Sequence, residues 1–137
     1  MIKAVIDTNV IVSAYVTKNL EAATSKIWEA VLQCKLTPIY NEEILNEYSE
    51  VLHREKFGIP QHLIKWALDT IITNGIRGEH IMSEEFFPDP KDVVFYEVAL
   101  SKEDAYLVTG NKKHFPKKPI VVTPAEMLEI LKGEGIL

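Results

Sequence analysis

Carboxylates stand at three places in the chain where a folded protein could gather them into one metal site. Asp7 directly follows the apolar stretch 2–6, Glu47 lies within NEEILNEYSEVL, and Asp92 lies within DPKD. Asn111 follows the apolar stretch AYLVT closely and adds an amide oxygen. Oxygen donors of this kind select Mg²⁺ or Mn²⁺ rather than zinc. The four histidines show no HExxH or paired spacing, which argues further against zinc.

Each of these residues also has a purely structural interpretation. Asp7 could cap the element that follows it. Asp89 and Asp92 have the spacing of a helix cap and its capping-box partner, and spacing alone favours that interpretation over metal binding. Glu47 lies roughly 100° from the centre of the apolar face of its predicted helix, so it fits a solvated face or a metal site equally well. Asn111, directly after a glycine, could simply complete a turn.

The elements that must position these side chains alternate along the chain. The sequence predicts strands at 2–6, 37–40, 105–109 and 120–122, with a further short one at 79–82, and helices at 22–33, 41–54, 60–73, 90–102 and 124–132. The strands are continuous apolar runs, which are typical of a parallel sheet covered on both faces. We therefore expect a single three-layer α/β domain over residues 1–137. Ligands bind at the carboxyl ends of strands in such sheets, which is where Asp7 and Asn111 fall.

Composition narrows the class of protein. The chain has 137 residues, a net charge of −5 and one cysteine, so it can form neither an internal disulfide nor a CxxC motif. We expect no signal peptide and no membrane span, and hence a cytoplasmic protein. The negative charge argues against nucleic-acid binding, unless clustered acids hold divalent cations and so present a neutralised surface.

A basic segment directly follows Asn111. It contains Lys112, Lys113, His114, Lys117 and Lys118, the densest group of basic residues in the chain. Such a run is commonly a solvated loop, but its place beside the predicted metal site favours a role in binding RNA phosphates. Phe115 could stack on a base, although a buried anchor is the favoured interpretation.

Two other enzyme classes fit the sequence less well. Phosphatases of the haloacid dehalogenase type also begin with a strand that ends in aspartate, but they need a second aspartate two residues later. Asn9 occupies that position here. The chain also lacks the GxGxxG and GxxxxGK[ST] motifs of nucleotide-binding folds.

Four stretches taken together resemble the PIN domain. They are IDTNVIVSAY, NEEILNEYSEVL, FFPDPKDVVFYEVALSKEDAYLVTGNKKHFP and IVVTPAEML, and they span nearly the whole chain in the family's order. Within that family the chain looks most like the VapC-like toxins of toxin–antitoxin pairs, the PIN_3 type. The resemblance implies a PIN-like α/β/α fold and a Mg²⁺- or Mn²⁺-dependent endoribonuclease that leaves a 5′-phosphate. It also implies a small antitoxin partner and a homodimer.

The resemblance carries over residue by residue. The first three family acids match Asp7, Glu47 and Asp92, as catalytic residues and metal ligands, while the fourth acidic position holds Asn111. Asn111 carries one negative charge less, and it could still coordinate metal or orient water. Asp104 could partly compensate for the lost charge, as could Asp89 or Glu97.

Thr8 and Asn9 are candidates to support the carboxylate of Asp7 by hydrogen bonds, although both could equally form only a tight turn. The departure at Asn111 keeps an alternative open. In that alternative, the chain is a PIN-fold module that has lost hydrolysis and binds RNA or a protein partner.

Overall fold

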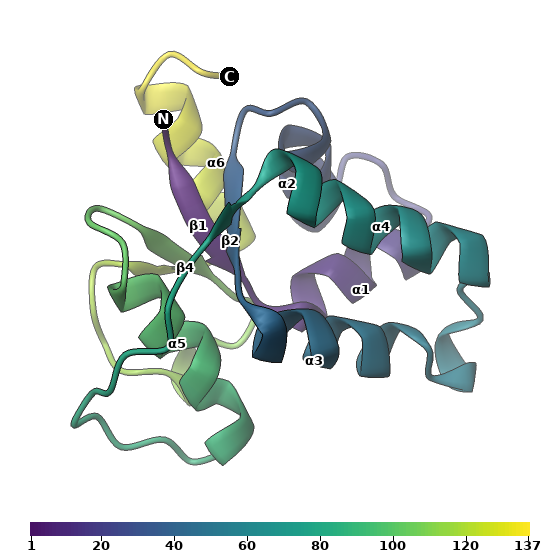
Figure 1. Cartoon of the computed structure of the whole chain (residues 1–137). Helices are drawn as coiled ribbons and strands as arrows, with labels where there is room; N and C mark the ends of the chain where they lie inside the picture. Colours follow the sequence, from purple (N-terminus) through teal and green to yellow (C-terminus); the bar gives the residue numbers. More distant parts are fainter.

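The computed structural model describes all residues, 1–137, and has a parallel five-stranded sheet at its centre (Figure 1). The strands lie in the order β3-β2-β1-β4-β5. Their bounds are β1 Lys3–Ile6, β2 Thr37–Tyr40, β3 Ile76–Arg77, β4 Tyr106–Val108 and β5 Val121–Val122. Every neighbouring pair is parallel, and the central strands are almost completely buried. The predicted α/β fold with a parallel central sheet is confirmed.

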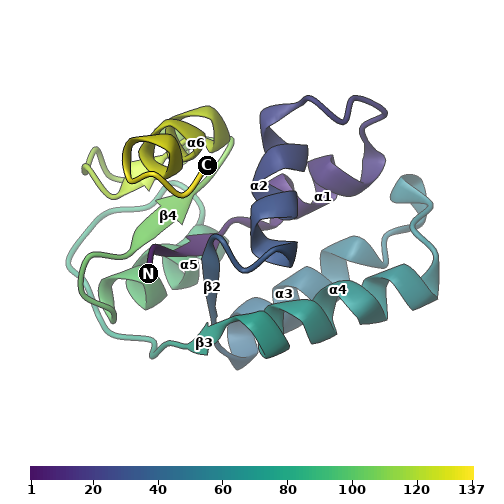
Figure 2. The same ribbon diagram turned by 90° about the horizontal axis from the view of Figure 1, so that it is seen from above.

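Six helices flank the sheet. Their bounds are α1 Thr8–Val16, α2 Ala23–Leu32, α3 Glu42–Leu52, α4 Gln61–Asn74, α5 Val93–Leu100 and α6 Pro124–Gly133. Figure 2 shows α2 and α6 side by side on one side of the strands, with α5 on the opposite side. α5 is apolar on nearly all sides because it packs against the strands inside and a covering segment outside. α3 and α4 run alongside each other on the side of the molecule where β2 and β3 lie (Figures 1 and 2).

Three predicted helix starts have the expected caps. The Asn41 side chain accepts a hydrogen bond of 2.9 Å from the Ile44 N–H at the start of α3. The Thr123 side chain accepts one from the Glu126 N–H, and Glu126 completes the capping box of α6. The Asp89 carboxylate accepts a bond from the Lys91 N–H, but the helix it opens begins as a short 3₁₀ turn over Pro90–Asp92 before α5.

Two features differ from the sequence prediction. Residues 8–16 form α1, to which no element was assigned, because this stretch is apolar on almost every side and lacks a clear helical periodicity. The predicted strand at 79–82 is wrong, and the strand in this region is β3, at Ile76–Arg77. β3 ends where the Gly78 N–H bonds to the carbonyl of Tyr40, the last residue of β2, so no further pairing partner remains.

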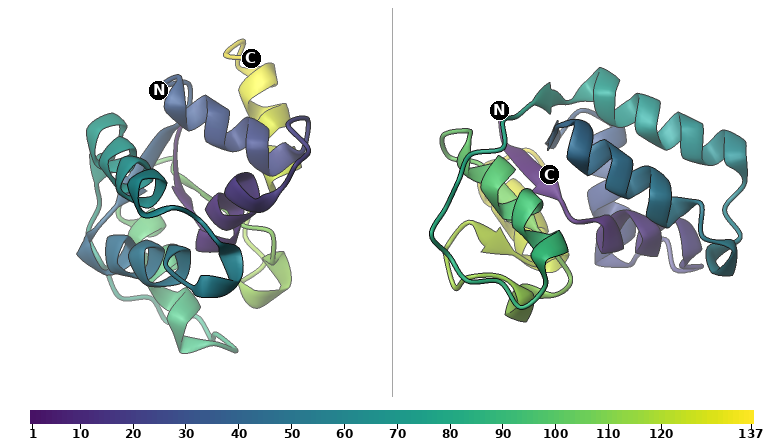
Figure 3. Two further views of the ribbon diagram at one scale, coloured as in Figure 1. Left: turned by 90° about the vertical axis from the view of Figure 1, so that its right-hand side faces the viewer. Right: turned by 60° about the horizontal axis from the view of Figure 1, so that its bottom comes forward.

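The segment from Gly78 to Asp89 has no regular structure and passes around the outside of α5 (Figure 3, right). Glu97, a buried residue of α5, holds it in place. The Glu97 carboxylate accepts hydrogen bonds from the Ser83 N–H at 2.5 Å and from the His80 ring at 2.6 Å. His80 also bonds to Glu43 on α3, so this segment links α5 to α3. None of the helices is long and apolar enough to cross a membrane.

Candidate metal-dependent nuclease site

Asp7 lies at the carboxyl end of β1, and 7% of its surface is exposed. It occupies the residue before α1, but its side chain makes no capping hydrogen bond. Instead, its Oδ2 accepts bonds from the Thr109 hydroxyl at 2.7 Å and from the Asn9 amide at 3.2 Å. Burial raises the pKa of Asp7, while the bond from Thr109 acts in the opposite direction. The carboxylate is therefore held in a fixed orientation at some cost to its ionised form.

The register of the sheet brings Thr109 to Asp7. Ile6 pairs with Val108, so the residues after these two strands emerge side by side at one edge of the sheet. Thr109 is fully buried, and its hydroxyl also accepts the Asn111 N–H at 3.0 Å. The sequence prediction placed Thr109 only as the last residue of the strand at 105–109. The alignment of two strand ends could have identified it, because Asp7 and Thr109 follow the two central strands immediately.

Asp92 ends the short turn before α5 and retains 17% of its side-chain surface. Its Oδ2 is buried and has no hydrogen-bond partner, so the predicted capping box at Asp92 is wrong. His114 is the nearest base, with Nδ1 at 3.7 Å from Oδ2. Burial, followed by the charges of Asp7 and Asp89, raises the pKa of Asp92 to about 6. An unpaired buried carboxylate oxygen is costly, and a cation would satisfy it.

Glu47 comes from α3 and is half-buried, without a hydrogen-bond or ion-pair partner. Its neighbour Tyr48 fixes this turn of α3 to the sheet, because the buried Tyr48 hydroxyl donates a 2.5 Å hydrogen bond to the carbonyl of Ile6. Burial in this position strongly raises the pKa of the Tyr48 phenol. Burial is the main cause of the raised pKa of Asp7 and of Asp92. The charge of Glu47 makes a smaller contribution in the same direction to both. These three carboxylates, called the carboxylate site below, therefore share one electrostatic environment.

Beside the carboxylate site lies an open cleft of about 470 Å³. Glu47 and the residues next to Asp92 form part of its wall, and the full lining is Glu43, Glu47, His80, Met82, Pro90, Lys91, Val93, Val94 and Glu97. Glu97 reaches this cleft from α5 but is engaged by His80 and Ser83. Glu47 is therefore the member of the carboxylate site that this cleft reaches, whereas Asp7 and Asp92 are not among its lining residues.

The predicted supporting residues divide into two groups. Asn9 donates to Asp7 and accepts the Gly110 N–H at 3.3 Å, so it ties both strand ends together. The Thr8 hydroxyl is buried without any hydrogen-bond partner and does not bond to Asp7. Asn111 is exposed, and its amide side chain makes no hydrogen bond within the protein. Its backbone bond to Thr109 nevertheless places it next to Asp7.

Asp104 requires a correction, because the structure does not bring it to the carboxylate site. It is exposed and lies before β4, in a left-handed turn with φ of 59°. Ala4 pairs with Tyr106, so Asp104 lies at the amino edge of the sheet while Asp7 lies at the carboxyl edge. Five residues of strand separate the two levels, which is roughly 16 Å. Asp104 therefore cannot compensate for the missing charge at Asn111.

The predicted basic segment divides by its ion pairs. Lys112 bonds to Glu126 at 3.0 Å, and Lys118 lies 3.3 Å from Glu85. Lys113 and Lys117 are exposed and form no ion pair. His114 turns toward Asp92, as described above.

Phe115 is a buried anchor, as sequence analysis favoured. It is 6% exposed, and its ring packs edge-on against Phe87 at 6.2 Å. This contact holds the basic segment against the segment that wraps α5.

The oxygen donors of the carboxylate site are of the type that a hard divalent cation binds. They do not, however, form a complete coordination shell. Asp7, Asp92 and Glu47 supply only oxygens, and Asp92 Oδ2 is an orphaned buried acceptor. No group of three or more His, Cys, Asp or Glu side chains lies close enough to hold an ion fully. An ion here would therefore retain several waters, as Mg²⁺ commonly does.

The parallel sheet, with the buried carboxylate of Asp7 at its carboxyl edge, makes this an α/β protein whose ligand site is expected at that edge. The model of the PIN domain family matches residues 3–113, so the chain belongs to the PIN domain family. PIN domains are typically nucleases, and PIN domain nucleases generally use divalent metals, so this membership indicates a nuclease in general terms that acts on nucleic acid. No curated protein and no solved structure shows significant similarity to the chain.

Proposed function

We propose that residues 1–137 form a single PIN-like domain that acts as a Mg²⁺- or Mn²⁺-dependent endoribonuclease. The observation that carries this proposal is the unpaired, buried Oδ2 of Asp92 in the same electrostatic environment as the buried Asp7. The charge of Asp7 hinders ionisation of Asp92, and neither acid forms an ion pair with a lysine or arginine, so the site needs another counter-charge. A divalent cation is the counter-charge that also gives this site a chemical activity.

Within this proposal each side chain has a distinct part. Asp7 and Asp92 would hold the cation directly, and Glu47 would hold a water beside it. Asn111 orients the attacking water with its free amide group, while Thr109 and Asn9 keep Asp7 in position. The bound cation supplies an activated water and stabilises negative charge on the phosphate. Water attacks phosphorus and the P–O3′ bond breaks, which leaves a 3′-hydroxyl and a 5′-phosphate.

We further propose that the protein is the toxin of a type II toxin–antitoxin pair, cytoplasmic and homodimeric, and inhibited by a small antitoxin. The support for this role is the likeness of IDTNVIVSAY and the later stretches to VapC-like toxins of the PIN_3 type. Expression of the chain alone in growing cells tests this role: the wild-type chain should arrest growth, and an Asp7→Asn chain should not. Normal growth with full expression of a cleavage-active chain would contradict the toxin role.

A cleavage assay tests the nuclease itself. Purified protein is incubated with a mixed pool of single-stranded RNA in Mn²⁺, Mg²⁺ or EDTA, and Asp7→Asn is prepared identically. We expect metal-dependent cleavage in the wild type alone. Cleavage that persists in EDTA or in Asp7→Asn would overturn the proposal.

The second candidate is a PIN-fold module that binds RNA or a protein without hydrolysis. It is favoured by Asn111 at the fourth acidic position and by the absence of a closed ligand group. Calorimetry with Mn²⁺ separates the two. Saturable binding that Asp7→Asn abolishes supports the nuclease, and no binding together with no cleavage supports the module.

A further inference from the structure

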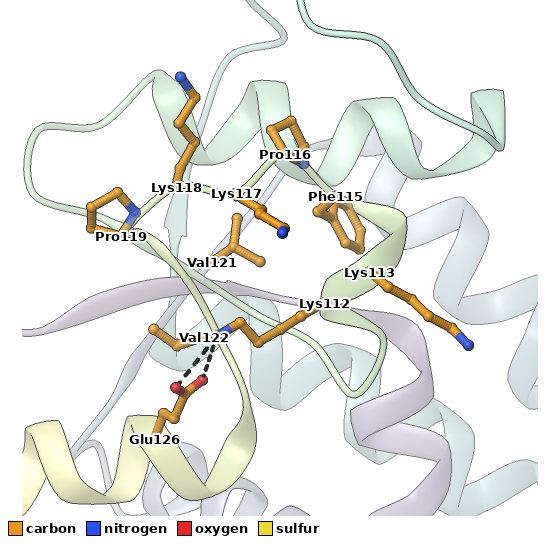
Figure 4. Close-up of a pocket in the computed structure, with 10 residues that line it drawn as sticks. All are labelled: Lys112, Lys113, Phe115, Pro116, Lys117, Lys118, Pro119, Val121, Val122 and Glu126. Atoms are coloured by element: carbon orange, nitrogen blue, oxygen red, sulfur yellow. Dashed lines mark hydrogen bonds and ion pairs between the residues drawn. The ribbon is translucent and has the colours of Figure 1, made fainter.

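Between the basic segment and the start of α6 lies a second cleft, of about 660 Å³ (Figure 4). We call it the lysine cleft, and it is lined by Lys112, Lys113, Phe115, Pro116, Lys117, Lys118, Pro119, Val121, Val122 and Glu126. Its size is within the range of small-molecule sites. The cleft is separate from the one beside Glu47, and the two share no lining residue.

The walls of the lysine cleft combine two kinds of surface. Figure 4 shows Val121 in the middle of the cleft, with Pro116 and Pro119 on the loop above it. The Lys117 ammonium points inward over Val121, whereas Lys113 extends outward at the side. An apolar floor under a free ammonium suits a flat, partly apolar ligand that carries negative charge.

Only two of the four lysines keep a free charge. Glu126 neutralises Lys112 and Glu85 neutralises Lys118, while Lys113 and Lys117 have no acidic partner. Unpaired ammonium groups cost nothing when exposed to water, and they attract phosphate at short range. The capping box of α6 engages the N–H groups of Thr123 and Glu126, and Pro124 has no N–H, so the start of the helix offers few donors and a phosphate here would depend mainly on lysines.

The backbone around the cleft is fixed before any ligand arrives. The Phe115 N–H bonds to the Lys112 carbonyl, and the Val121 N–H bonds to the Lys118 carbonyl, both at 3.0 Å. Proline at 116 and at 119 restricts the backbone on each side of Lys117. A preorganised cleft loses little conformational entropy on binding.

The basic segment connects this cleft to the carboxylate site. It begins beside Asp7 through the Asn111–Thr109 bond, touches Asp92 through His114, and then continues around the cleft. A strand of RNA with one phosphodiester at the carboxylates can therefore extend along the segment into the lysine cleft.

From these observations we propose that the lysine cleft binds one unpaired nucleotide of the RNA, next to the nucleotide pair that is cleaved. The base lies on the floor of Val121 and Val122, and its phosphate is bound by Lys117 and Lys113. A base in this cleft cannot be paired, so the substrate is single-stranded at that position. This inference rests on the proposed nuclease function only in taking RNA as the polymer that is bound. Binding of a nucleotide in the cleft needs no metal, so it can be tested separately.

The test is a titration of ¹⁵N-labelled wild-type protein in EDTA, followed by amide chemical shifts. The probes are adenosine, guanosine, cytidine and uridine 5′-monophosphates, with ribose 5-phosphate as the probe without a base. We expect saturable shifts at Phe115, Val121 and Val122, and at least one nucleotide that binds about tenfold more tightly than ribose 5-phosphate, since burial of the apolar face of a base against valine adds that order of affinity.

Two exposed lysines provide matched variants. Lys117→Gln should weaken nucleotide binding several-fold, whereas Lys35→Gln, which removes an equally exposed and unpaired charge at the amino edge of the sheet, should have no effect. Equal binding of ribose 5-phosphate and every nucleotide would overturn the base site and leave only a charged surface. Absence of shifts at Val121 and Val122 would overturn it as well.

Failure of this inference can be distinguished from failure of the proposed function. Metal-dependent RNA cleavage without nucleotide binding in the cleft would remove the base site and retain the nuclease. Nucleotide binding without cleavage would retain the base site and remove the nuclease.

Discussion

The hydroxyl of Thr109 donates a 2.7 Å hydrogen bond to the buried carboxylate of Asp7, across 102 residues of sequence. The bond joins the ends of the two central strands of the sheet. It opposes the effect of burial on the pKa of Asp7, so it favours the ionised form that a metal requires. It also fixes which oxygen of Asp7 remains available, because Oδ2 accepts from both Thr109 and Asn9.

Thr109→Val should therefore weaken metal binding while preserving the shape of the side chain. Loss of a hydrogen bond that orients a ligand commonly reduces metal affinity 10- to 100-fold, and we expect a reduction of that size for Mn²⁺ in calorimetry. Thr70→Val is the control, because its hydroxyl bonds to a carbonyl of its own helix α4. Unchanged Mn²⁺ affinity in Thr109→Val would show that this bond does not support a ligand.

Tyr48→Phe should destabilise the protein, because the buried carbonyl of Ile6 loses its 2.5 Å partner. An unsatisfied buried acceptor costs about 1–3 kcal/mol, which urea unfolding followed by circular dichroism can measure. Tyr106→Phe is the matched control, since its half-buried hydroxyl makes no hydrogen bond in the structure. Equal midpoints for the two variants would mean that the Tyr48 bond contributes nothing to the placement of α3.

The His80–Glu97 pair should make stability depend on pH. The bond to Glu43 raises the pKa of His80 above its ordinary 6.5 against the effect of burial, with a further contribution from Glu97. Burial opposes ionisation of Glu97, but bonds from Ser83 and His80 bring its pKa below 4.5. His80 thus stabilises fully below pH 6.5 and loses this effect as pH rises through its folded pKa. Glu97 stabilises above pH 4.5 and loses this effect on acidification.

His80→Gln should therefore lower the urea midpoint more at pH 5.5 than at pH 8.5. His62→Gln, on the exposed side of α4 and without a partner, should show no such difference. A His80→Gln effect of the same size at both pH values would mean that the ionised pair does not hold the segment around α5.

Asn111→Asp tests the departure from the four-acid pattern. The added carboxylate lies beside Thr109 and should raise Mn²⁺ affinity several-fold by charge alone. Asn46→Asp, an exposed change on α3, controls for the general effect of a more negative protein. If both variants bind Mn²⁺ like the wild type, Asn111 does not face the bound ion.

The sequence was sufficient to place Asp7 at the carboxyl end of the first strand, since the apolar run 2–6 ends directly before it. It also predicted the α/β class and most helices, because their apolar positions and caps are local signals. Local signals of this kind did not identify Thr109, since its contact with Asp7 depends on how two strands align, a non-local property. Asp104 was misplaced because it is close to Asn111 in sequence but not in space. Strand β4 lies between them and runs from the amino edge of the sheet to the carboxyl edge.

Glu97 shows a second limit of sequence reasoning. On a predicted helix it is simply a glutamate on the side away from Asp92, and it ranked as a weak metal ligand. The structure buries it at 3% exposure under the segment from Gly78 to Asp89, where it accepts hydrogen bonds from the His80 ring and the Ser83 N–H. Only the path of that irregular segment, which no periodicity predicts, reveals this role.

Asp92→Asn should separate stability from activity. In metal-free protein above pH 6, ionised Asp92 is unfavourable, because its folded pKa of about 6 exceeds the ordinary 3.8. A raised acid pKa destabilises the fold as pH rises above the unfolded value, and two units correspond to less than about 3 kcal/mol once solvent screening is considered. We expect the free energy of unfolding of Asp92→Asn to rise by about 1 kcal/mol at pH 7.5 in EDTA. The variant should also lose cleavage and the stabilisation by Mn²⁺.

Asp69→Asn, which changes an exposed acid on α4, is the control and should alter neither cleavage nor the stabilisation by Mn²⁺. A destabilised Asp92→Asn in EDTA would instead assign Asp92 a structural role and remove it from the metal site.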